Sequence, residues 1–96
     1  MEIKYTKHFL NKLEDVFSET EYQLRYEKGS FKSGYCLLRD HKIAVVNKYY
    51  SLEGKINCLI DILKSIEIDP SSLCEKNRKL YLGLLQTEIE LWESLF

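Results

Sequence analysis

The first regular pattern along the chain is helical and lies near the N-terminus. Between Tyr5 and Ser18, apolar side chains return every three or four residues, a spacing that gathers them on one face of a helix. That face consists of Phe9, Leu10, Leu13, Val16 and Phe17. The Thr6 hydroxyl is placed to accept from the free amides of the first turn, so we expect the helix to begin just after it.

The hydrophobic period then shortens to two residues. Tyr22, Leu24 and Tyr26 alternate with polar residues, which is typical of a strand with one buried face. Two further runs, 31–39 and 42–50, are rich in β-branched and aromatic residues and predict a β-hairpin. Its loop is expected at Asp40 and His41, with the length open by a residue or two. Counting outward from this loop pairs Leu38 with Ile43, Cys36 with Val45 and Tyr35 with Val46.

Both faces of the predicted hairpin are apolar in the middle. The first face carries Cys36, Leu38, Ile43 and Val45, and we expect it to face the core. The second face carries Tyr35, Leu37, Ala44 and Val46. Large bare apolar patches are uncommon on monomers, so this second face needs cover. Either the C-terminal helix or a second copy of the chain supplies that cover, and the sequence does not choose between them.

The rest of the chain predicts two more helices. Ser51 is the expected N-cap of the second helix, which should end near Ile68 because Pro70 cannot continue a helical hydrogen-bond ladder. Residues 72–75 match a capping box and predict a third helix that begins at about position 73, and Gly83 admits either a break in it or a close helix contact. The apolar stripe of the second helix makes it the central packing helix, and it comprises Ile56, Leu59, Ile60, Leu63 and Ile66.

These elements predict a single α+β domain over residues 1–96. Its order is a helix, a three-stranded antiparallel sheet that contains the β-hairpin, and then two helices, with the first two helices on one sheet face. The length is that of one domain, and 45% hydrophobic with 30% charged residues is an ordinary globular composition.

Charge and composition narrow the classes of partner. Fourteen basic residues against fifteen acidic ones leave a formal net charge of -1, so nucleic acid is not favoured as a partner. The chain start lacks the pattern of a secretory signal, and no apolar stretch approaches the ~20 residues of a membrane span. We therefore expect a cytoplasmic protein with no membrane association. The three cysteines, Cys36, Cys58 and Cys74, are interpreted as packing residues.

Motifs that carry chemistry are not found in the sequence. His8 and His41 lack a second histidine or cysteine at zinc-ligand spacing, so we expect both at the surface. Nothing in the sequence directs an imidazole toward a cysteine to activate it. We predict no catalytic, cofactor-binding or metal-binding residues and no cofactor.

The middle of the chain resembles a group of small uncharacterised bacterial proteins, chiefly of Bacteroidetes type. The residues that carry the resemblance are 29–36 (Gly-Ser-Phe-Lys-Ser-Gly-Tyr-Cys), 42–48 (Lys-Ile-Ala-Val-Val-Asn-Lys) and 51–56 (Ser-Leu-Glu-Gly-Lys-Ile). The resemblance covers positions 22–68 and implies no particular activity.

A weaker similarity connects the chain to the ImmA/IrrE zincin-like peptidases, whose core also runs from a strand hairpin to a helix. In that family the helix carries a HExxH zinc motif, whereas positions 58–64 here read Cys-Leu-Ile-Asp-Ile-Leu-Lys without histidine. A shared architecture would therefore imply a non-catalytic version of it.

The leading hypothesis is a non-catalytic cytosolic binding or self-association module, which acts on a protein partner or as a homo-oligomer. Surplus apolar surface motivates it, and the expected interface residues are Tyr35, Leu37, Val46, Leu91, Trp92, Leu95 and Phe96.

Three alternatives stay open. One is a small enzyme or ligand-binding protein with a site between the sheet and the second helix, built on Cys36, Tyr26 or Tyr35. Another is a single-stranded nucleic-acid binder that stacks bases on aromatic residues of the sheet. In the third, the surplus apolar stripes simply close one monomeric core.

Overall fold

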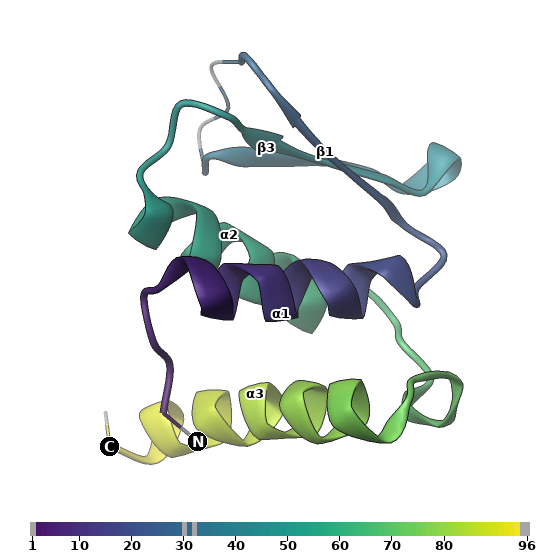
Figure 1. Ribbon diagram of the computed structural model, residues 1–96, viewed down its shortest axis with the longest axis vertical. Coiled ribbons are helices and arrows are strands. Elements are labelled where there is room, and N and C mark those ends of the chain that lie inside the picture. The colour runs from purple at the N-terminus through teal and green to yellow at the C-terminus, as the bar shows by residue number, and fades with distance from the viewer. Residues whose placement is uncertain (1, 30, 32, 95–96) are drawn as a thin grey trace.

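The computed structural model describes residues 2–29, 31 and 33–94, with side chains up to residue 86. Figure 1 shows a layered α+β arrangement in which the sheet lies on one pair of helices and a further helix lies beneath that pair. The elements of the described part are α1 (Lys7–Ser18), β1 (Gln23–Glu27), β2 (Tyr35–Leu38), β3 (Ile43–Asn47), α2 (Leu52–Ser65) and α3 (Glu75–Ser94), with short 3-10 turns at Arg39–His41 and Pro70–Ser72.

The sheet is mixed, so the prediction of an antiparallel sheet is wrong. Its strand order is β1-β3-β2, with β3 antiparallel to β2 and parallel to β1. Strands that follow one another closely in the sequence are usually neighbours in the sheet, but here β3 lies between β1 and β2. The central strand, β3, is the most apolar of the three, and its Ala44, Val45 and Val46 are all buried.

The expected register of the hairpin is confirmed. Leu38 pairs with Ile43 and Cys36 with Val45. The loop that joins the strands is longer than two residues, because Arg39–His41 form a 3-10 turn. Lys42 completes the loop in the left-handed conformation, with φ 54°, and its N–H donates to the Arg39 carbonyl at 3.3 Å.

The two faces of the hairpin are the reverse of the prediction. Ala44 and Val46 are fully buried in the core, whereas Leu38 on the opposite face is 41% exposed. The parallel pairing sets Leu24 beside Ala44 and Tyr26 beside Val46. The apolar face of β1 therefore joins this face of β3, and the helices cover both together.

The reversal also removes Val46 from any interface, since its exposed fraction is 0%. Tyr35 and Leu37 are half-buried and pack against the core. The side chains of Leu91 and Trp92, and all of Leu95 and Phe96, lie outside the described residues.

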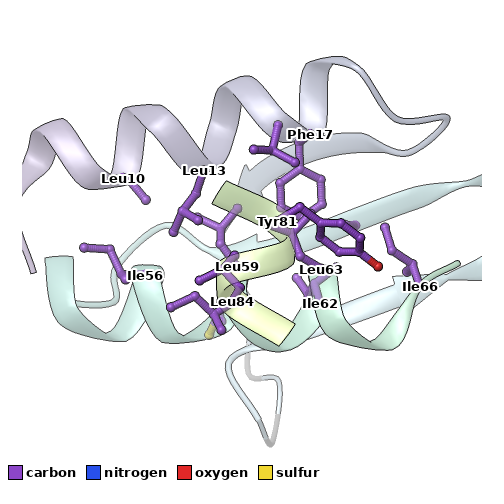
Figure 2. Packing of buried hydrophobic residues seen from close by; sticks show 14 of the residues in the cluster. Leu10, Leu13, Phe17, Ile56, Leu59, Ile62, Leu63, Ile66, Tyr81 and Leu84 are labelled. Carbon is purple, nitrogen blue, oxygen red and sulfur yellow. The ribbon is translucent and has the colours of Figure 1, made fainter. Parts of the chain in front are cut away.

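Local capping signals are confirmed for the first two helices. The Thr6 hydroxyl accepts from the Phe9 N–H at 3.1 Å, and the Ser51 hydroxyl accepts from the Gly54 N–H at 3.1 Å. α2 ends at Ser65, a little before the expected position, and α3 runs without a break at Gly83. Figure 2 shows the core that these helices form; its labelled members include Leu13, Phe17, Leu59, Leu63, Tyr81 and Leu84.

The predicted capping box at the start of α3 is wrong. The Ser72 hydroxyl donates instead to the Asp69 carbonyl at 2.7 Å, within the 3-10 turn. The cap comes from another helix, because the Cys74 N–H lies 3.1 and 3.3 Å from the two carboxylate oxygens of Glu19. Asn77, 1% exposed, adds side-chain bonds from its Nδ2 to Glu19 Oε1 at 2.5 Å and Asp15 Oδ2 at 3.1 Å. These hydrogen bonds therefore connect the end of α1 to the start of α3.

Truncating one residue on each face tests the reversed orientation of the sheet. We expect Val46→Ala to lower the free energy of unfolding by about 2 kcal/mol, because it removes fully buried methyl groups and leaves a cavity. The matched change on the opposite, exposed face, Leu38→Ala, should lower the free energy of unfolding by less than about 1 kcal/mol. Urea denaturation of both variants measures the difference, and equal losses would contradict the orientation.

A second test concerns the junction of α1 and α3. Asn77→Asp puts a buried carboxylate beside Asp15 and Glu19, so we expect a loss of about 3 kcal/mol or more in unfolding free energy at neutral pH. Asn57→Asp is the control, since the exposed Asn57 accepts from the Tyr5 hydroxyl and Asp keeps that acceptor; its effect should stay within about 0.5 kcal/mol. Equal urea midpoints for the two variants would argue against the junction.

Candidate functional site

A cleft of about 820 Å³ opens at one end of the molecule. The connection from α1 to β1 and the connection from α2 to α3 meet there, at the right-hand end of Figure 1. We call it the acidic cleft, and define it by its carboxylates Glu19, Glu21, Glu67 and Asp69 and its tyrosines Tyr22 and Tyr81, with Thr20, Ser72, Ile66 and Ile68 completing the lining. Its chemistry is therefore anionic and aromatic.

Two of the carboxylates are held in place by hydrogen-bond donors. The Asn77 amide and then the Cys74 N–H lower the pKa of Glu19 below its usual range. Asp69 accepts from both the hydroxyl and the N–H of Ser71, at 2.8 and 3.0 Å, and these bonds lower its pKa too. Donors that bond the charged form stabilise that form, so both groups stay ionised well below neutral pH.

The lining of the acidic cleft, within the residues that the structure describes, includes no lysine or arginine. Lys42 lies beside it, with its Nζ 3.6 Å from Glu21 Oε2 and 5.3 Å from the centroid of the Tyr22 ring. The Lys42 ammonium group therefore lies near both a carboxylate and the face of a tyrosine ring.

A second hollow of about 400 Å³ lies between α1 and β1, and we call it the groove. It shares Thr20 and Tyr22 with the acidic cleft, so the two hollows adjoin. Tyr26 lines it and donates from its hydroxyl to Glu14 Oε2 at 2.5 Å. Burial of the ring, followed by this bond to Glu14, raises the pKa of Tyr26 well above its usual range. The groove therefore has an apolar floor and a fixed carboxylate at its wall.

The three cysteines do not share one environment. Cys58 is buried in α2, its Sγ donates to the Ser33 carbonyl at 3.7 Å, and burial with the nearby Asp61 raises the pKa of its thiol. Cys36 is half-buried on the outer sheet face, and Cys74 is exposed before α3. The interpretation of all three as packing residues is thus confirmed for Cys58 and wrong for Cys74.

The residues proposed for a site between sheet and second helix are brought together only in part, because Tyr26 and Tyr35 flank Val46 on the face that the helices cover and Cys36 does not. Tyr26 lies in the groove, whereas Cys36 is on the opposite face of the sheet. Tyr35 is near α2, where burial and then the charge of Asp61 raise its pKa.

Both histidines, His8 and His41, are exposed, as expected. Within the described residues, no group of three or more His, Cys, Asp or Glu side chains is arranged to bind a metal ion. None of the described helices combines the length and apolar character needed to cross a membrane.

Sequence reasoning missed the acidic cleft because its acids come from two connections far apart in the chain. Glu19 and Glu21 follow α1, and Glu67 and Asp69 follow α2. The sequence does show each pair of acids directly after a predicted helix. The pairs indicate a shared site only once the structure shows that both helices end on the same side of the fold.

The chain matches no protein-family model, and no curated protein or solved structure shows significant similarity to it. The resemblances to the small bacterial proteins and to the zincin-like core therefore stay predictions.

Thiol labelling tests the difference between the cysteines. The thiolate is the reactive form, so the raised pKa and burial of Cys58 should make it react at least about a hundredfold more slowly than Cys74. Reaction with an aromatic disulfide reagent, followed by mass spectrometry of peptides, measures each rate. In urea the rates should converge. Rapid labelling of Cys58 in the folded protein would contradict its burial in α2, whereas a Cys36 that reacts faster than Cys74 would favour the alternative of a site between the sheet and the second helix.

Proposed function

We propose that the protein is a non-catalytic binding module whose acidic cleft takes lysine or arginine side chains of a partner protein. The observation that carries this proposal is a lining with four carboxylates and two tyrosines, which are 9% and 6% exposed, and with no basic side chain among the described lining residues. A long basic side chain has an apolar stem and a charged end, and this lining offers a surface for each.

The strength of such contacts is sufficient for recognition when several act together. A cation over a tyrosine face contributes about 0.5–1 kcal/mol at an exposed site. An exposed ion pair adds about 0.2–1 kcal/mol. Two or three basic side chains bound at once would therefore give a weak, salt-dependent complex, which is a common property of transient protein contacts.

Charge recognition suits these carboxylates better than proton transfer does. A general acid or base works best with a pKa near the working pH. The bonds to Glu19 and Asp69 lower their pKa values instead, which keeps the charge fixed. For the same reason, binding has more support than catalysis at this cleft.

Binding of a short, fluorescein-labelled peptide of alternating lysine and valine tests the proposal. We expect the double variant Glu21→Gln, Glu67→Gln to raise Kd about tenfold, because two ion pairs are lost. Fluorescence anisotropy at low and high salt measures the affinity, which should fall as salt rises.

Matched controls separate the cleft from general charge. Glu53 is an exposed acid in the first turn of α2, at the opposite end of that helix from Ile66, so Glu53→Gln should leave Kd within about twofold. Lys42→Met removes the ammonium group that already bonds Glu21, so it should tighten binding severalfold, by about the energy of one surface pair. A peptide of alternating glutamate and valine should not bind. Equal effects of the Glu53 and cleft substitutions would overturn the proposal.

A further inference from the structure

β1 is an edge strand with unpaired backbone groups on its outer side. The Gln23 N–H donates to the Lys42 carbonyl at 2.8 Å, and the Glu27 carbonyl accepts from the Lys48 N–H at 3.1 Å, so both residues bond toward β3. Backbone groups alternate in direction along a strand. Leu24 and Tyr26 therefore direct their N–H and C=O groups away from β3, and no described strand pairs with them.

This edge lacks three of the features that prevent pairing at natural edge strands, namely a proline, a bulge and a covering segment. Its remaining protection is its short length and the charges of Arg25 and Glu27. Residues 23–27 contain no proline and pair with β3 in unbroken register. Instead of covering the edge, α1 leaves the groove beside it, which is lined by Glu14 and Phe17 of α1 and by Leu24 and Tyr26 of β1.

We infer that an extended basic segment of a partner protein adds to the free edge of β1 as a further strand, with alternate side chains in the groove and one end in the acidic cleft. The inference rests on the proposed function and names how the partner is held. It follows from the continuity of the two hollows, which share Thr20 and Tyr22 at the start of β1. The main-chain bonds of such an added strand supply affinity, and the pockets for alternate side chains supply specificity.

Charge favours a basic foreign segment over a second copy of this chain. The path along the groove and cleft presents Glu14 at one end and Glu19, Glu21 and Glu67 at the other. Two copies of β1 paired antiparallel over their full length would align Arg25 with its counterpart, and like charges directly opposite each other destabilise a sheet.

Amide hydrogen exchange, followed by NMR with the lysine–valine peptide present, tests the inference. The amides of Leu24 and Tyr26 should exchange at least about tenfold more slowly in the complex, because they acquire acceptors. The Arg25 amide, which already bonds toward β3, is the internal control and should change little. Anisotropy with two N-methylated peptides is the second measurement, one modified at its lysines and the other at its valines. One should bind like the parent and the other at least about tenfold more weakly, since only alternate residues of an added strand bond the edge.

The outcomes distinguish the two proposals. Peptide binding that is sensitive to the cleft substitutions but leaves the exchange of Leu24 and Tyr26 unchanged would overturn strand addition and leave the proposed function standing. If both N-methylated peptides bind as tightly as the parent peptide, strand addition is likewise overturned and the proposed function stands. No binding of the parent peptide would overturn both. Protection of Leu24 and Tyr26 that grows with protein concentration alone would identify a second copy as the occupant and overturn the basic foreign segment.

Discussion

The parallel pairing of β1 with β3 is the constraint on which the rest of the structure depends. It sets Leu24 beside Ala44 and Tyr26 beside Val46, so the apolar faces of two strands form one surface. α1 and α2 cover that surface, and none of the described helices covers the opposite face of the sheet (Figure 1). A slip of one residue would turn every side chain of β1 to the other face, so burial fixes this register strongly.

The same pairing creates both hollows. It leaves β1 at the edge next to α1, which produces the groove, and it brings the start of β1 to the end of the molecule where α2 and α3 are connected. Glu19 then has two roles there, because it caps α3 through the Cys74 N–H and also lines the acidic cleft. Stability and the candidate site share this carboxylate, so substitutions of Glu19 itself would confound the two.

The buried Asn77 amide strengthens this junction through its donors, yet its Oδ1 has no hydrogen-bond partner within the described residues. An unpaired buried acceptor lowers the net gain from such a network. We infer that the arrangement orients the helices, because the carboxylates of Asp15 in α1 and of Glu19 just after it bond one amide of α3 and so fix how α3 crosses α1. A simple apolar contact would place α3 less uniquely.

The sequence by itself determined what depends on near neighbours. The helical period, the caps at Thr6 and Ser51 and the hairpin register were predictable, because each arises from residues close together in the chain. Tertiary structure decided the parallel pairing of β1, the face that the helices cover and the cap of α3 by Glu19. Each depends on a partner distant in sequence, and both faces of the hairpin were apolar enough to be buried. The acidic cleft belongs to this second group, since its four acids converge only after α1 and α2 have packed side by side.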